Sequence, residues 1–284
     1  MSLRADATAS RLLEPYPPKA AQLIVTIYGD IVEPRGGVLW MGDLIGLCAG
    51  FGVNESLVRT AVSRLVSKGQ LEGQREGRRS FYALTPTARD EYHLAADLFF
   101  GTPDKECDWI ISYCPRAADQ VDLKKQGFVS LGGPVFAGAD RPGRAHPGVT
   151  FRSQALKPES DELKQLVRKS FGLAPLAAEY RGFLEKIEPL ADEIQSVKVG
   201  QSALLLRVAL VHAYRHIRLR DPRLPKSVLP KDWPGFAARQ RFAELYIALS
   251  KLADAHIGES FLNQAGPLPA RPQPVVERLS SLAA

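Results

Sequence analysis

The stretch NESLVRTAVSRLVSKGQLEGQREGRRSFYALT, residues 54–85, carries the most specific local signals in the chain. Asn54 belongs to the residue types that cap helix amino termini, and Gly69 is typical of a helix end, so the pattern predicts a helix between them. Two runs of alternating residues follow on either side of Glu76 and Gly77, which predicts a β-hairpin that turns there. We therefore expect a helix followed at once by a hairpin.

The expected helix has two chemically different faces. The face predicted to be buried consists of Leu57, Val58, Ala61, Val62, Leu65 and Val66. The opposite face consists of Glu55, Arg59, Thr60, Ser63, Arg64, Ser67 and Lys68. Arginine binds guanine edges or phosphates, and small hydroxyl side chains allow a close approach to the nucleic-acid backbone. This composition favours a helix that reads double-stranded DNA in the major groove.

The hairpin adds positive charge next to that helix. Arg75, Arg78 and Arg79 are expected near its tip, where they could straddle the sugar-phosphate backbone. From Glu55 to Arg79 there are six basic and three acidic residues, so both elements share one sign of charge. The predicted DNA-contacting residues are Asn54, Glu55, Arg59, Thr60, Ser63, Arg64, Lys68, Arg75, Arg78 and Arg79. A basic surface helix followed by a basic hairpin, with no nucleic-acid partner, is the alternative interpretation.

The residues upstream complete a known order of elements. Residues 20–37 read as a helix that a proline and two glycines stop, and residues 41–52 read as a second helix. Together with the helix and hairpin they predict a winged helix-turn-helix domain over residues 20–101, which a helix at 86–100 completes. Residues 1–19 are broken by prolines and are expected to form a flexible arm.

Downstream, the pattern changes twice. After a linker at residues 101–106, residues 107–156 combine short strand-like runs with one polar helix and predict a small α+β sheet domain. Residues 138–148, GADRPGRAHPG, read as a loop because they have no helical period. Residues 157–284 are helical by pattern, and the proline-rich tail beyond Ala265 is expected to be loosely held. The chain as a whole is expected to be α+β.

Composition describes an ordinary soluble protein. Apolar residues make up 45% of the 284 residues, and every long apolar run is broken by charge before the roughly 20 residues that span a bilayer. The first residues lack the apolar core of a secretory signal. Three cysteines without CxxC spacing argue against a disulfide scaffold or a zinc ribbon. We expect a cytoplasmic protein with no membrane contact.

No sequence motif for catalysis is found. The chain has no Walker loop, no GxGxxG after a strand, no HExxH and no GxSxG. His212 and His216 have the i,i+4 spacing that a metal needs, but Arg215 would lie close to any bound cation. We therefore expect packed or surface histidines, no metal, no resident cofactor and no enzyme activity.

Several of these motifs resemble one family. YGD, PRGG, LVRTAVSRLV and EGRRSFYALT resemble the amino-terminal domain of the PaaX family, the phenylacetate-degradation repressors. Between residues 221 and 235, DPRLP, VLP and DWPG are similar to the family's carboxy-terminal signature. The resemblance extends from Ala20 to Leu252.

The resemblance implies a fold and a function. The implied fold is a winged helix-turn-helix, a ferredoxin-like middle domain similar to Cas2, and a helical carboxy-terminal domain for effector binding and dimerisation. The implied function is a homodimeric repressor of aromatic-compound catabolic genes, which an aryl-CoA such as phenylacetyl-CoA releases from operator DNA. One departure concerns residues 138–148, where the family's second middle-domain helix would fall.

Such an effector carries phosphates, which makes a second basic stretch relevant. From Leu204 to Arg241 there are nine basic and two acidic residues, and arginine binds phosphate oxygens bidentately. The candidate effector-binding residues are Arg207, Tyr214, Arg215, Arg218, Arg220, Arg223 and Trp233. Their aromatic members are expected to wall an adenine or aryl ring. The alternative is that Arg215 or Arg218 pairs with Asp221 or Asp232 and fixes the proline-rich turn.

Two other classes of function remain open from the residues alone. A metal-dependent nuclease of the Cas2 type would need carboxylates clustered at strand ends, and Asp108 has no second acid aligned with it by pattern. An architectural or adaptor protein would use the same winged helix for protein contacts. We expect a ligand-controlled repressor that binds a palindromic site as a dimer.

Overall fold

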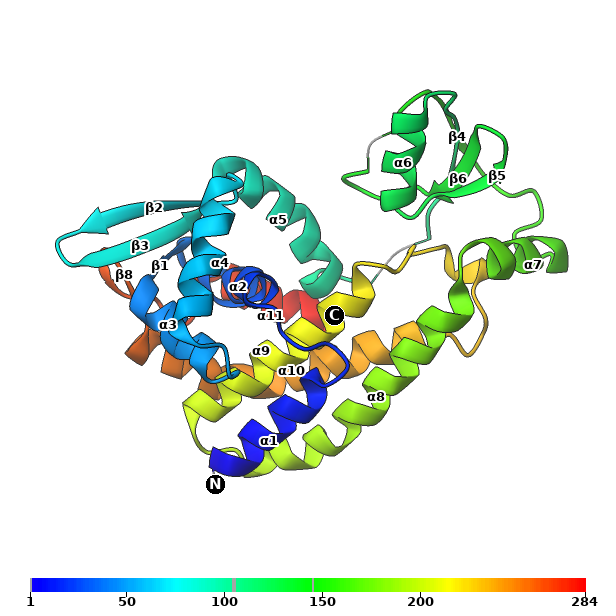
Figure 1. Cartoon of the computed structure of the whole chain (residues 1–284). Helices are drawn as coiled ribbons and strands as arrows, with labels where there is room; N and C mark the ends of the chain where they lie inside the picture. The colour runs from blue at the N-terminus through cyan, green and yellow to red at the C-terminus, as the bar shows by residue number, and fades with distance from the viewer. Residues whose placement is uncertain (1, 104–105, 145) are drawn as a thin grey trace. The chain divides into compact units, whose positions relative to one another are not determined.

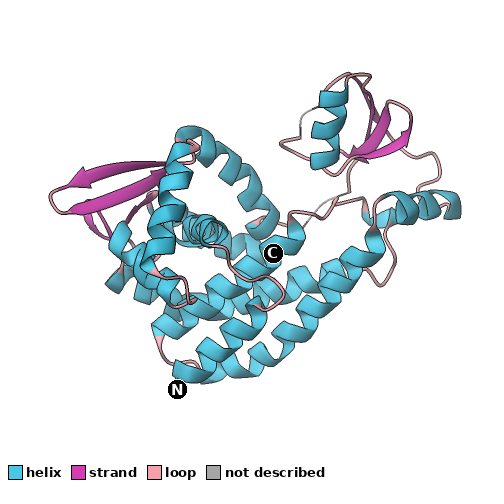
Figure 2. Ribbon diagram, viewed as in Figure 1, coloured by secondary structure: helices cyan, strands magenta, loops and turns pink. Residues whose placement is uncertain are grey.

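The computed structural model describes residues 2–103, 106–144 and 146–284. The fold is mixed α+β, with long helices and small antiparallel sheets (Figure 2). The chain forms two compact units. Unit 1 contains the segments up to Thr102, Phe183–His216 and Arg239–Ala284, and unit 2 contains Pro103–Gly182 and Ile217–Ala238.

The first part of unit 1 follows the expected order of helices and a hairpin. Its elements are α2 (Ala20–Ile27), a π-helical turn η1 (Tyr28–Val32), η2 (Glu33–Arg35), β1 (Val38–Trp40), α3 (Met41–Ala49), α4 (Glu55–Ser67), β2 (Leu71–Glu76), β3 (Arg79–Leu84) and α5 (Pro86–Phe100) (Figure 1). The Asn54 side chain accepts a hydrogen bond from the Leu57 amide, which confirms it as the amino-terminal cap of α4. Gly69 and Gly77 have positive φ angles, as a helix end and a tight hairpin turn require.

The hairpin belongs to a three-stranded antiparallel sheet with the order β1-β3-β2. Strand β1 pairs with β3 from Val38 opposite Ala83 to Trp40 opposite Phe81. No strand was predicted here, because three residues are too few to show an alternating pattern. Because α3 begins directly after β1, the pairing of β1 with β3 holds the start of α3 next to the hairpin.

The buried face of α4 is narrower than predicted. Val58, Ala61, Val62 and Leu65 are buried, as expected. Leu57 and Val66, however, are 53% and 39% exposed, so their assignment to the core was wrong. They lie at the two edges of the apolar stripe, where α2 and α3 no longer cover the helix. These edges extend the solvent-facing surface of α4.

Helices from both ends of the chain complete unit 1. They are α1 (Ser2–Leu13), parts of α8 (Leu173–Ser196), α9 (Gly200–Arg218) and α10 (Pro234–Ser260), a short hairpin β8–β9 (Leu262–Asn263 and Gly266–Pro267), and α11 (Gln273–Ala283) (Figure 1). Among the described residues, no helix is both long and apolar enough to cross a membrane.

Two expectations about the chain ends were wrong. Residues 2–13 form a helix instead of a flexible arm, because Leu12 and Leu13 are buried against the rest of unit 1. The tail beyond Ala265 is likewise held in place. Val275 and Leu282 of α11 are buried, and Arg278 bonds to the main chain of η1. In both cases apolar residues flanked by prolines form a packed helix.

Unit 2 contains a four-stranded antiparallel sheet. Its elements are β4 (Trp109–Tyr113), α6 (Ala117–Lys125), β5 (Val129–Gly132), β6 (Val135–Ala139), β7 (Val149–Ser153) and α7 (Asp161–Ser170), and the strand order is β5-β6-β4-β7. Ile110, Phe136 and Leu123 form a core between one face of the sheet and α6. The described part of residues 138–148 contains no helix, as expected, and α7 follows β7 instead.

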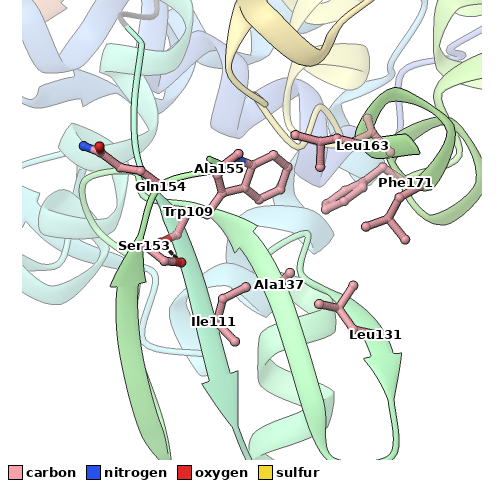
Figure 3. Close-up of a pocket in the computed structure, with 11 residues that line it drawn as sticks. Trp109, Ile111, Leu131, Ala137, Ser153, Gln154, Ala155, Leu163 and Phe171 are labelled. Atoms are coloured by element: carbon pink, nitrogen blue, oxygen red, sulfur yellow. Dashed lines mark hydrogen bonds between the residues drawn. The ribbon is translucent and has the colours of Figure 1, made fainter. Parts of the chain in front are cut away.

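The other face of this sheet lies against α7. Trp109 and Ile111 of β4 and Leu163 of α7 point toward a common space (Figure 3), a cavity of about 190 Å³. The Trp109 and Phe171 rings lie 6.1 Å apart, centre to centre, and form part of its wall. The strands β4 to β7 thus have one face packed on α6 and one face partly covered by α7.

Candidate nucleic-acid interface and effector region

The outward face of α4 carries the predicted DNA-contacting side chains in the predicted positions. Residues Asn54, Glu55, Arg59, Thr60, Ser63, Arg64 and Lys68 are all exposed. Arg59 forms an ion pair with Glu55 at 2.7 Å, one helical turn away. Arg64 and Lys68 make no ion pair with the residues that the structure describes. The helix therefore offers two uncommitted positive charges and one that Glu55 already holds.

A groove joins α4 to the hairpin. Its volume is about 450 Å³, and it is lined by Met41, Arg59, Val62, Ser63, Val66, Ser67, Gly73, Gln74, Arg75, Ser80 and Tyr82. Serine hydroxyls and two guanidinium groups thus face one hollow between the helix and the strands. Gly73 lies in β2 opposite Tyr82, whose ring occupies the space that a larger residue would need.

The three hairpin arginines have different surroundings. Arg75 donates from Nε to the Gly77 carbonyl at 3.2 Å, which holds it along the turn. The Arg79 guanidinium lies over the Trp40 ring, 5.1 Å from its centre. Its side chain therefore points toward β1 and not outward beyond the hairpin turn. Arg78 is exposed and has no ion pair within the described parts of the chain. Of the three, Arg78 is the one best placed to reach a partner beyond the hairpin.

Arg207 was expected to bind the effector, and the structure contradicts this. Its side chain is 1% exposed and forms ion pairs with Asp30 at 3.0 Å and Asp254 at 2.6 Å. The neighbouring Tyr214 is also buried, because its ring stacks on Phe242 at 4.2 Å. Both side chains are core residues, since the helix α9 that carries them is enclosed in unit 1.

Within unit 2, the other candidate effector residues hold the turn that follows α9. Arg218 pairs with Asp221 at 3.1 Å, as the alternative interpretation proposed. Asp221 also accepts from the Tyr180 hydroxyl at 2.7 Å and from the Arg223 amide at 2.7 Å. Arg220 pairs with Glu179, and Trp233 is buried edge-on against Tyr180. These contacts hold the proline-rich segment after α9 in its folded conformation.

The two histidines of α9 have separate environments. His212 is buried, and its Nδ1 lies 2.9 Å from the Thr26 hydroxyl. Because that hydroxyl donates to the Gln22 carbonyl at 3.0 Å, the imidazole donates to it from Nδ1. Burial lowers the pKa of His212 to about 4, so the ring is neutral at pH 7. The structure describes no group of three or more His, Cys, Asp and Glu side chains that could hold a metal ion.

Sequence reasoning missed a buried polar network in unit 1. Asp30 accepts from Arg207 and from the Tyr246 hydroxyl at 2.7 Å, and Asp254 accepts from Arg207 and from Arg35 at 2.7 Å. Asp30 and Arg35 belong to the YGD and PRGG motifs, from which only a family resemblance was inferred. The sequence feature that could have revealed this network is the presence of charged residues on the predicted buried faces of strongly apolar helices, because buried charges are normally paired.

Two family models match this chain. Residues 19–88 match the model of the PaaX-like protein, and residues 171–259 match that of the PaaX-like protein C-terminal domain. The first span contains α4, the hairpin and Asp30, and the second contains Arg207 and Asp254. The chain belongs to the PaaX-like protein family.

A curated relative matches nearly the whole chain. It is the transcriptional repressor PaaX of Escherichia coli strain K12, which is 30% identical over 292 aligned positions, 93% of this chain and 91% of the relative. A solved structure, the uncharacterized protein Rv0674 from Mycobacterium tuberculosis, is 21% identical. It matches 75% of this chain and 89% of its own with a TM-score of 0.45.

Proposed function

We propose that this protein is a transcriptional repressor that binds double-stranded operator DNA through a winged helix-turn-helix formed by residues 20–101. The observation that carries the proposal is the groove between α4 and the hairpin, where exposed hydroxyl and guanidinium groups share one concave surface. A recognition helix needs such groups for base edges, and a wing needs them for the backbone. The transcriptional repressor named among its relatives supports the same function.

The remaining domains of the proposal follow the family. The strand order β5-β6-β4-β7 and the packing of α6 on one face of the sheet support a ferredoxin-like, Cas2-like middle domain. In this proposal a long loop joins β6 to β7, where the family's second middle-domain helix would fall, and α7 follows β7 in the chain. The helices after residue 157 form the effector and dimerisation domain, and a homodimer binds two half-sites.

The proposal includes control by a ligand. The target genes serve the breakdown of aromatic compounds, and an aryl-CoA such as phenylacetyl-CoA releases the protein from its operator. Release requires that the effector bind the DNA-incompetent arrangement more tightly, by about 1–3 kcal/mol for a usable switch. Operator DNA must then weaken effector binding by the same factor.

Selection of bound DNA from random duplexes tests the proposal directly. We expect a palindromic consensus, which should be recovered in the absence of phenylacetyl-CoA and depleted in its presence. Arg64→Ala should relax the consensus at one base position, whereas Arg168→Ala, at an exposed site on α7, should keep the full consensus. Recovery of random sequences by the unaltered protein would contradict sequence-specific repression.

A further inference from the structure

A second cavity lies inside unit 1, between α2, α5 and α9. Its volume is about 280 Å³, and its lining residues are Val25, Thr26, Gly29, Asp30, Gln70, Leu84, Ala88, Glu91, Tyr92, Ala95, Phe99, Phe100, Val211 and Arg215. Tyr92, Phe99 and Phe100 place three aromatic rings of α5 on one wall. The remaining lining residues are partly aliphatic and partly polar, and an apolar wall with a few polar groups is the usual form of a small-molecule pocket.

Arg215 is the one basic side chain among these lining residues. It is partly buried, and it forms no hydrogen bond or ion pair with any residue that the structure describes. Burial lowers the pKa of Arg215 below its ordinary value, and no neighbouring carboxylate raises it again. A guanidinium that is partly removed from water without a partner loses some of its hydration, whereas charges buried in proteins are normally paired.

The other polar groups of the cavity wall are already committed or exposed. Arg207 and Tyr246 bond to the Asp30 carboxylate, and the Thr26 hydroxyl bonds to Gln22 and His212. Glu91 is exposed and makes no ion pair with Arg215. The guanidinium is therefore the polar group that a ligand would meet unpaired.

We propose that this cavity binds an aromatic acyl group, with the ring against Tyr92, Phe99 and Phe100 and the carboxylate or carbonyl oxygens on Arg215. Aromatic walls favour a ring through stacked and edge-on contacts, and a guanidinium binds a carboxylate bidentately. The inference rests on the proposed function, because it gives the aryl end of the effector a site. The cavity lies below the size range of drug-sized pockets, so a coenzyme attached to the acyl group would lie outside it.

The position of the cavity connects it to the DNA-contacting surface. Leu84 ends β3 of the hairpin, Ala88 lies in the first turn of α5, and Gln70 joins α4 to β2. A ligand that wedges α5 away from α2 would shift the base of the hairpin relative to α4. This supplies a physical route from effector binding to DNA release within unit 1.

Calorimetry on the full chain tests the inference with phenylacetate, phenylacetyl-CoA and free coenzyme A as probes. Two variants alter the cavity in different ways. Arg215→Gln removes the charge, and Ala95→Leu fills the cavity without breaking any hydrogen bond. We expect each to weaken binding of the aryl probe at least tenfold, whereas Arg168→Gln, which removes an exposed charge from α7, should bind as the unaltered protein does.

The probes distinguish two possible ligands, a free aromatic acid and its coenzyme A thioester. Binding of phenylacetate assigns the cavity to a free aromatic acid, and binding of phenylacetyl-CoA alone assigns it to a thioester. Free coenzyme A that binds as tightly as its thioester would overturn the inference, as would probe binding that both cavity variants leave within twofold of the unaltered protein.

DNA affinity without ligand is measured in parallel, so that failures can be told apart. Both variants should retain it, because neither residue lies on the α4 or hairpin surface. If the unaltered protein binds operator DNA but none of the probes, the cavity inference fails and the repressor proposal stands. If it binds an aryl probe through Arg215 but no DNA, the repressor proposal fails and the cavity assignment stands.

Discussion

The arginines of the surface proposed to contact DNA differ in the contacts that they already make within the protein. Glu55 neutralises Arg59 through an ion pair in the same helix, and Trp40 covers Arg79. Arg64 on α4 and Arg78 at the hairpin turn have neither restraint among the described residues. A side chain without an internal partner breaks no ion pair or ring contact when it binds a base edge or a phosphate, so these two should contribute most.

Arg64→Ala and Arg78→Ala are predicted to affect DNA binding differently. Arg64→Ala should weaken binding to the operator by about 1–3 kcal/mol and relax the preference at one base position. Arg78→Ala should weaken binding to all sequences alike, since a backbone contact carries no sequence information. Competition binding with single-base operator variants measures both effects. An unchanged base preference in Arg64→Ala would remove that residue from the recognition surface.

His212 is a residue whose charge state is set by its surroundings. Its folded-state pKa of about 4 lies below the ordinary 6.5, because burial disfavours the imidazolium and Arg215 and His216 repel it. The folded protein therefore binds fewer protons at this site than the unfolded chain does. The stabilising contribution is complete above pH 6.5 and is lost as the pH falls toward 4.

Urea unfolding at pH 7 and pH 4.5 is predicted to show this loss. His212 should account for roughly 2–3 kcal/mol of the decrease in the free energy of unfolding, at about 1.4 kcal/mol for each pKa unit. His212→Gln cannot take up a proton, so the difference between the two pH values should shrink by that amount. An equal difference in both proteins would show that His212 does not titrate with unfolding.

At the scale of elements, a buried ion network joins the amino-terminal helices to those near the carboxy terminus. Asp30 of η1 and Asp254 of α10 share the Arg207 guanidinium of α9, and Arg35 and Arg278 add further contacts. Buried charges cost desolvation energy, which only good geometry repays. All of these contacts form only when η1, α9, α10 and α11 pack in one particular arrangement. A helix packed in any other way would leave a buried charge unpaired.

Asp30→Ala is predicted to destabilise unit 1 by about 3–5 kcal/mol, because it leaves Arg207 and Arg278 buried with too few acidic partners. Glu244→Ala is the matched control, since it removes a partly exposed i,i+3 pair with Arg241 on α10 and should cost less than about 1 kcal/mol. Denaturant unfolding compares the two. Equal stabilities of the two variants would mean that the network contributes little.

At the scale of the whole molecule, the net charge of +6 is unevenly distributed in the structure. The basic stretch from Leu204 to Arg241 is largely neutralised by Asp30, Asp254, Asp221 and Glu179. Most basic side chains of α4 and of the hairpin β2–β3 are exposed to solvent. A DNA-sized polyanion would therefore meet its strongest attraction at the hairpin side of unit 1.

DNA affinity is predicted to fall steeply with salt, because each phosphate neutralised by the protein releases condensed counterions. The logarithm of the binding constant should fall linearly with the logarithm of salt concentration, by about 0.9 for each phosphate contact. Arg78→Ala should reduce that slope by about 1 for each subunit that binds. Filter binding across a salt series measures it, and a flat dependence would exclude a phosphate-contacting hairpin.

The sequence by itself determined the local part of this protein. The cap at Asn54, the end at Gly69 and the turn at Gly77 depend on neighbours within a few residues, so helix α4 and the hairpin could be predicted with their surface side chains. The strands and helix α6 of unit 2 followed from alternation and polarity for the same reason. Leu57 and Val66 were misassigned because periodicity cannot tell how wide a stripe the neighbouring helices cover.

Which charges are available to a partner depends on how distant segments of the chain pack together. Arg207 looks like a ligand-binding residue on its helix, but its acidic partners lie 177 and 47 residues away in the chain. Arg215, about two turns further along the same helix α9, lies beside an aromatic cavity and has no partner among the described residues. The sequence presents both as arginines of one largely apolar helix and does not show which of them is paired. The difference arises from pairing between distant segments, which periodicity and composition do not record.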